Sequence, residues 1–180
     1  MAERGNTSRS RAALLDLIAE NVDRLVNLDI SGYGVIGALH QAARAHYKRP
    51  LAHLAAERLH RAVRPGERVF LTSGWVMPGY YPVGETDGPI GAAALGRALA
   101  LGLNAKPVIL TEETMVGITA ASCRGAGLNV LSEADVERAP RAPHGANAHA
   151  LVLPFPVDDE HALKEAKRLF EQYRPKALIA

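Results

Sequence analysis

The sequence lacks the features that mark small secreted, membrane and nucleic-acid-binding proteins. Cys123 is the single cysteine among 180 residues, so no intramolecular disulfide can form and a cysteine metal cluster is excluded, as suits a reducing cytoplasm. No apolar run approaches the roughly 20 residues of a membrane span. The 21 Lys and Arg nearly balance the 19 Asp and Glu, which argues against a basic surface for nucleic acid. We therefore expect a cytoplasmic protein that binds neither nucleic acid nor a membrane.

The chain does have enough apolar residues, 48%, to bury a core. We expect a flexible N-terminus over residues 1–9 and a single α/β domain over 10–180, in which 10–65 is a helical lead-in and 67–180 alternates strands with helices. The expected helices are 10–27, 35–47, 51–63, 90–101, 113–125 and 158–173, and the expected strands are 68–73, 106–111, 128–131, 148–153 and 176–180. This alternation predicts a mostly parallel sheet with helices on both faces.

The last expected strand is apolar up to its final residues, Ala177–Ala180. Such a strand is normally covered on both faces, so we expect a neighbour from a missing C-terminal half or from another chain. The expected partners are accordingly a second copy in a homo-oligomer, or a chain that supplies the rest.

The densest chemistry lies on the loop after the first expected strand, which runs from Thr72-Ser73-Gly74 to Gly84–Gly91. Gly88 permits a tight turn, Pro89 suits the first helical position, and Gly91 leaves the first turn without a bulky side chain. This pattern predicts an anion site. Glu85 and Asp87 would repel an anion, unless a divalent ion or the ammonium group of an amino acid lies between them. The alternative is that Asp87 only caps the helix and Glu85 is solvated.

A second glycine motif, Gly32–Gly37, matches the dinucleotide-binding pattern G-x-G-x-x-G. A helix is expected before it, however, and no strand–helix–strand unit follows before Arg68. We interpret it as a glycine-rich connection between helices, and no nucleotide cofactor is expected.

Several blocks of the sequence resemble the D-glutamate cyclase-like family. They correspond to the N-terminal half of the family's C-terminal domain, which was long known only as a domain of unknown function. They are Asp29–Gly37 with Pro50-Leu51, Thr72–Trp75 and Gly84–Leu95, of which Glu85–Pro89 is the most specific. Two departures stand out. Tyr33-Gly34 replaces the arginine–glycine pair usual in the family, and family chains continue beyond the strand that ends here at Ala180.

The resemblance implies a lyase that cyclises D-glutamate, or a related amino acid, to 5-oxo-D-proline with loss of water. Glu85 and Asp87 would be catalytic and would hold the ammonium group or a divalent metal, Mg or Mn, with Glu85 as the candidate base. Six residues would bind the substrate: Thr72, Ser73, Gly74, Thr86, Gly88 and Gly91. Two alternatives stay open: a divalent-metal-dependent hydrolase of a small phosphorylated metabolite, and a non-catalytic subunit or binding module of a larger assembly.

Overall fold

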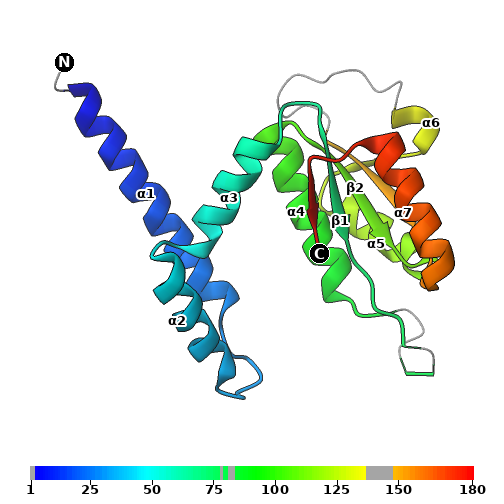
Figure 1. The fold of residues 1–180 in the computed structure, drawn as a ribbon, viewed down its shortest axis with the longest axis horizontal. Helices are drawn as coiled ribbons and strands as arrows, with labels where there is room; N and C mark the ends of the chain where they lie inside the picture. The colour runs from blue at the N-terminus through cyan, green and yellow to red at the C-terminus, as the bar shows by residue number, and fades with distance from the viewer. Residues whose placement is uncertain (1–2, 78, 81–83, 137–147) are drawn as a thin grey trace. The chain divides into compact units, whose positions relative to one another are not determined.

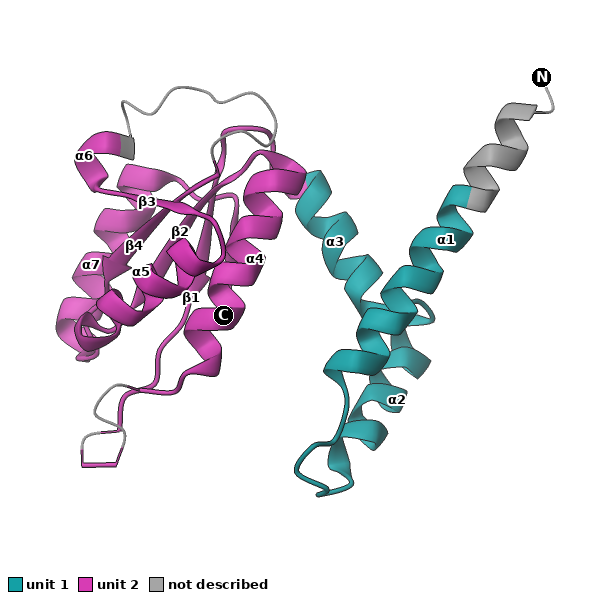
Figure 2. Ribbon diagram, turned by 180° about the vertical axis from the view of Figure 1, so that it is seen from behind, with its two compact units in different colours: residues 1–61 teal, residues 62–180 magenta. Residues whose placement is uncertain are grey.

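The chain divides into two compact units, residues 1–61 and 62–180 (Figure 2). The structure is a computed structural model that describes residues 3–77, 79–80, 84–136 and 148–180, without the side chains of residues 3–10 and 136. The expected change from helices to alternating strands and helices falls near the boundary between the units. That both units together form a single domain stays a prediction.

Unit 1 consists of three helices: α1 (Glu3–Val26), α2 (Val35–Tyr47) and α3 (Leu51–Ala62) (Figure 1). The latter two match the expected helices closely, whereas α1 begins earlier than the expected start at Ser10. The motif Gly32–Gly37 starts in the connection between α1 and α2, where Gly32 and Gly34 have φ of 71° and 73°. The interpretation of this motif as a connection between helices is therefore confirmed.

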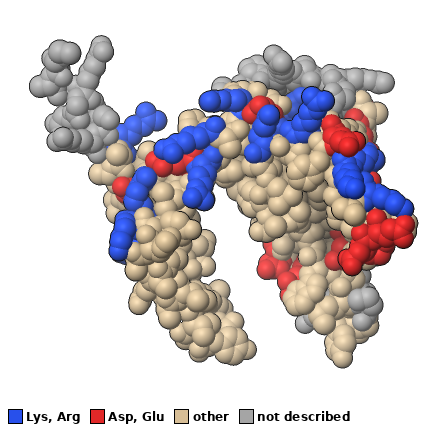
Figure 3. Space-filling view, in the orientation of Figure 1, with Lys and Arg blue, Asp and Glu red and all other residues tan. Residues whose placement is uncertain are grey.

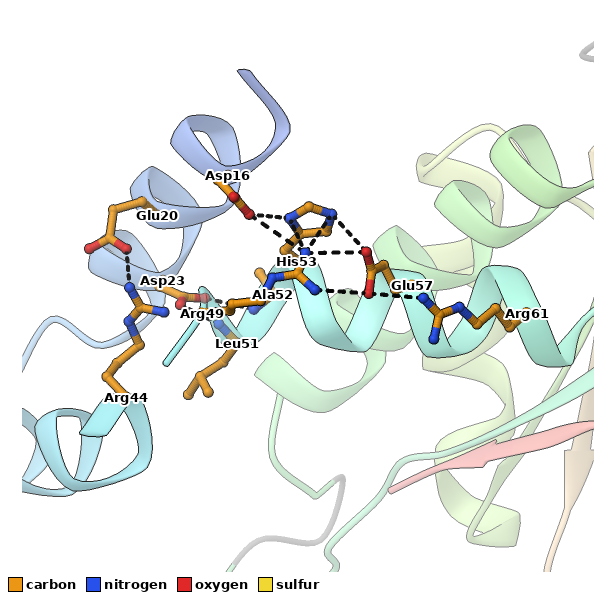
Figure 4. A network of polar contacts seen from close by, with 10 residues as sticks. All are labelled: Asp16, Glu20, Asp23, Arg44, Arg49, Leu51, Ala52, His53, Glu57 and Arg61. Atoms are coloured by element: carbon orange, nitrogen blue, oxygen red, sulfur yellow. Dashed lines mark hydrogen bonds and ion pairs between the residues drawn. The ribbon is translucent and has the colours of Figure 1, made fainter. Parts of the chain in front are cut away.

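Acidic side chains of α1 hold α2 and α3 in place (Figure 4). Asp23, only 2% exposed, accepts hydrogen bonds from the backbone N–H groups of Leu51, at 2.6 Å, and Ala52, at 2.8 Å. Glu20 forms a 2.8 Å ion pair with Arg44 of α2. The Asp23 carboxylate thus caps α3, whose first amides have no partner within their own helix.

Asp16, also on α1, extends this network along α3 by a bond to the ring of His53. Arg49 lies 3.8 Å from Asp16 and reaches Glu57 through two hydrogen bonds of 3.2 Å. The bonds between Arg49 and Glu57 lower the pKa of the Glu57 carboxyl and raise that of the guanidinium. The polar side of α1 therefore faces its two neighbouring helices.

Unit 2 is an α/β fold built on a five-stranded sheet in which all the described pairs are parallel. The strand order is β3-β4-β2-β1-β5. The strands are β1 (Arg68–Thr72), β2 (Lys106–Thr111), β3 (Asn129–Leu131), β4 (His149–Pro154) and β5 (Ala177–Ile179). The expected parallel sheet is confirmed, and the apolar chain end forms the edge strand β5, paired with β1.

Helices cover both faces of this sheet. They are α4 (Asp87–Leu103), the 3₁₀ turn η1 (Glu113–Met115), α5 (Val116–Gly125), α6 (Glu133–Val136) and α7 (Asp159–Tyr173). Leu169 and Tyr173 of α7 pack in one core with Phe70. Gly96 of α4 lies instead against Leu71, whose side chain leaves the opposite face of the sheet. The expected helices on both faces are therefore confirmed.

Two local predictions differ from the structure. The helix expected over 90–101 begins earlier, at Asp87. Pro89, which is expected at the first helical position, is therefore the third residue of α4. Proline fits there because the first amides of a helix have no intrahelical acceptor. No helix is expected between the strands 128–131 and 148–153, but the short helix α6 lies there, and residues 137–147 lie outside the described residues.

Candidate functional site

The carboxyl ends of β1, β2 and β4 lie at one edge of the sheet. From this edge, the connections that follow β2 and β4 run to opposite faces of the sheet. After β2 the chain continues through η1 into α5, which packs beside α4. After β4 it continues into α7, on the other face. Connections that diverge from neighbouring parallel strands leave a crevice between them, which is the usual ligand site of such sheets.

Two of the cavities lined by described residues lie beside the ends of these strands. One, of about 280 Å³, is largely apolar and extends from Thr72 and Ser73 at the end of β1 to Phe170 of α7 and Leu178 of β5. The other, of about 530 Å³, is more open and lies beside Phe155, with Glu113 and Lys164 on its rim. The edge predicted from topology is therefore also where the described part of unit 2 is hollowed.

The end of β1 lies against the start of α4. The backbone N–H of Ser73 donates to the carbonyl of Leu110, which ties the end of β1 to β2. A Cβ atom added at Gly88 would lie only 2.8 Å from Ser73 Oγ, and one added at Gly74 would lie 3.1 Å from Thr111 Oγ1. The structure thus brings together Ser73, Gly74 and Gly88, three of the predicted substrate-binding residues.

Two hydroxyl groups at this contact are buried without a hydrogen-bond partner among the described residues. They are Ser73 Oγ and Thr111 Oγ1, and the whole of Thr111 is only 2% exposed. Because Thr72 pairs with Leu110, the next residues, Ser73 and Thr111, are neighbours on adjacent strands. A buried hydroxyl without a partner costs about 1–3 kcal/mol, which an oxygen or nitrogen atom of a ligand could recover.

Glu85 lies on the connection that enters α4, and Asp87 is the first residue of that helix. Both are exposed, and together with Gly84 and Thr86 they line one open cavity of about 390 Å³. Thr86 precedes α4 without capping it through its side chain. Thr72 and Ser73 line the apolar cavity instead. The structure therefore places the two acidic residues beside a common space, and their catalytic role stays a prediction.

The position of the acidic pair depends on Gly84. This residue is buried, has φ of +69°, and leaves no room for a side chain, since an added Cβ would lie 2.5 Å from Met115 Sδ. The N–H of Glu85 donates to the carbonyl of Trp75 at 3.3 Å. Gly91, by contrast, has nothing within 4 Å of an added Cβ, so that side of the first turn of α4 is open.

Glu112 is a further polar residue at this edge, and neither it nor Thr111 is among the candidate site residues predicted from the sequence. Its carboxylate accepts the backbone N–H of Val76 through both oxygens, at 2.9 and 3.1 Å. It thereby ties the loop after β1 to the end of β2. The available signal was the position of both residues directly after the apolar run of β2, the position that ligand-binding residues occupy in parallel sheets.

Glu85 and Asp87 are the candidate metal ligands at this edge. No group of three His, Cys, Asp or Glu side chains with metal-ligand geometry occurs within the described ranges. Two exposed carboxylates beside an open space suit Mg²⁺, which commonly binds through one or two carboxylates and keeps several waters. Glu85 and Asp87 would be those ligands.

The fold defines an α/β protein with cavities at the carboxyl ends of its parallel strands. A family model described as D-glutamate cyclase-like, C-terminal, matches residues 22–171. The chain therefore belongs to the D-glutamate cyclase-like family. No curated protein and no solved structure matches it. Among the described residues, no helix is long and apolar enough to cross a membrane.

Proposed function

We propose that this protein is a lyase that cyclises D-glutamate, or a closely related amino acid, to 5-oxo-D-proline. Membership of the D-glutamate cyclase-like family supports an enzyme of this type. The observation that carries the proposal is the shared cavity of Glu85 and Asp87, which adjoins the first turn of α4. Two carboxylates suit the ammonium group of an amino acid, whereas the partial positive charge at a helix start suits a carboxylate of the same substrate.

The reaction forms one C–N bond and releases one water molecule. The substrate ammonium group first loses a proton, and Glu85 is the candidate base. The neutral amine then attacks the γ-carboxylate carbon and loses a second proton. One C–O bond of that carboxylate breaks, and its oxygen leaves as water with two protons, which balance the two that the nitrogen lost. The first turn of α4 and the hydroxyl groups of Ser73 and Thr111 would bind substrate oxygens, with Gly88 allowing the close approach.

A divalent ion held by Glu85 and Asp87 would polarise the γ-carboxylate and favour attack on its carbon. The role of the chain would then be to hold the substrate between these two side chains and the start of α4. Thr86 lines the same cavity and would contact a substrate held there.

The test is incubation of the full chain with D-glutamate, with and without Mg²⁺ or Mn²⁺, followed by mass spectrometry. We expect a product that is lighter by one water molecule, and its loss in Glu85→Gln and Asp87→Asn. Glu113→Gln is the matched control, because Glu113 is an exposed acid at the same edge that lines a different cavity. Absence of the product under all conditions, or equal activity of all three variants, would refute the proposal. Metal-dependent release of phosphate from phosphorylated metabolites would instead indicate a hydrolase.

A further inference from the structure

Helix α1 turns its polar side inward and its apolar side outward. Asp16, Glu20 and Asp23 contact α2 and α3, and Asp23 is only 2% exposed. On the other side of the same helix, Leu25 and Val26 are 69% and 70% exposed. A surface helix normally buries its apolar side, so this arrangement indicates that a further apolar surface covers α1.

The exposed side chains form one continuous strip, which we call the α1 stripe. With 3.6 residues per turn, they fall within about 120° of the helix circumference. Each is at least 43% exposed. The members are Leu14, Leu15, Ile18, Val22, Leu25 and Val26. No charged residue interrupts the stripe, and Figure 3 shows that one end of unit 1 also presents a surface without charged side chains in that view.

We propose that the α1 stripe is the contact surface for a second copy of this chain. Leu15, Ile18, Val22 and Leu25 follow one another at intervals of three, four and three residues, which is the a/d spacing of a helix that pairs with another helix. A stripe of this kind is complementary to itself, so two copies related by a two-fold axis cover each other.

The area agrees with this assignment. From the exposed fractions, the stripe presents roughly 600 Å² of apolar surface, or roughly 1,200 Å² for two copies, which is at the lower limit of stable protein interfaces. Leu28 and Ile30, which follow α1 and are 57% and 93% exposed, are available to enlarge the contact. The surface is therefore sufficient for a dimer.

The charges on α1 disfavour a lipid membrane as the partner. Helices that lie on membranes usually carry Lys and Arg along their polar side. α1 has four basic side chains, Arg4, Arg9, Arg11 and Arg24, and as many acidic ones, of which Asp16, Glu20 and Asp23 face α2 and α3. The stripe therefore fits an uncharged protein surface better than an anionic bilayer. Three of its six members also precede residue 22, where the family match begins.

The test is sedimentation velocity of the full chain and of two variants over a range of concentrations. We expect the unchanged protein to sediment as a dimer and Ile18→Glu as a monomer with the same helical circular dichroism. Leu17→Glu is the matched control, since Leu17 is the adjacent residue, is similarly exposed at 59% against 52%, and lies outside the stripe. It should remain a dimer.

Two results would overturn the proposal: a monomeric unchanged protein, or a dimeric Ile18→Glu variant. A monomer that binds phosphatidylcholine vesicles through the stripe would mean that lipid covers α1, and a monomer that does not bind them would mean that another part of the same chain covers it. If Ile18→Glu fails to fold, the double variant Ile18→Ala with Leu25→Ala replaces it, since alanine preserves the helix. Its dimer dissociation constant should rise at least tenfold, whereas Leu17→Ala should leave it unchanged.

Discussion

Replacing Gly84 by alanine should destabilise unit 2 more than the same change at a comparable glycine. The left-handed backbone of Gly84, with φ of +69°, costs a residue with a Cβ about 1–2 kcal/mol. The new methyl group would also lie 2.5 Å from the sulfur of Met115, which is fully buried and has little room to move. Overpacking of this kind adds about 1–3 kcal/mol. We therefore expect a total loss of about 2–5 kcal/mol.

Gly66→Ala separates the two contributions to this loss. Gly66 is also left-handed, with φ of +86°, but it is exposed and an added Cβ would have nothing within 4 Å. Its replacement should cost only the backbone strain, about 1–2 kcal/mol. Urea unfolding followed by the fluorescence of Trp75, the single tryptophan, measures both variants in unit 2. Equal losses would refute the proposed conflict with Met115. With unequal losses, Met115→Ala should lessen the effect of Gly84→Ala in the double variant.

Three further predictions concern single side chains. Thr111→Val should raise the free energy of unfolding by about 1 kcal/mol, because it removes a buried hydroxyl group that has no partner among the described residues. The same change should weaken D-glutamate binding in calorimetry. A lower free energy of unfolding would contradict this prediction. Burial raises the pKa of the Cys123 thiol to about 11, so iodoacetamide should modify this thiol only after unfolding. The free energy of unfolding should fall as the pH rises from about 9 to 11, because the thiol of the unfolded chain loses its proton first. Rapid labelling of the native protein would contradict this prediction. Asp23→Ala should destabilise unit 1 by about 2–4 kcal/mol in urea unfolding followed by circular dichroism, since the first amides of α3 lose a buried acceptor; an unchanged midpoint would contradict this.

The sequence predicted the type of fold because each element carries its own local signal. Short β-rich runs such as Arg68–Thr72 alternate with helical spacing, and this alternation implies a parallel sheet. The strand order does not follow from such signals, because β2 and β4 are neighbours only through packing in three dimensions. The exact start of α4 was also beyond the local signal, since proline is tolerated throughout the first turn of a helix.

The candidate site was predictable in part for the same reason. Ser73 and Gly88 lie at a strand end and a helix start, and both positions can be identified along the chain. The role of Thr111 depends on the register between β1 and β2, which places it beside Ser73. That of Glu112 depends on a hydrogen bond to Val76, 36 residues earlier. Long-range pairs of this kind have no local pattern, so the position of these residues at the end of β2 did not by itself distinguish them from other polar residues at strand ends.

The orientation of α1 shows why periodicity alone identifies an amphipathic helix but not the side that packs. The usual expectation is an apolar side turned inward. Here α3 begins directly after Pro50, which has no side-chain acceptor, so its first amides need a cap from elsewhere. Asp23 supplies that cap, and Asp16, two turns earlier on the same side, reaches His53. The need of α3 for a cap therefore favours packing of α1 through the side that carries Asp16 and Asp23, which are seven residues apart. The apolar side of α1 is then left for a partner.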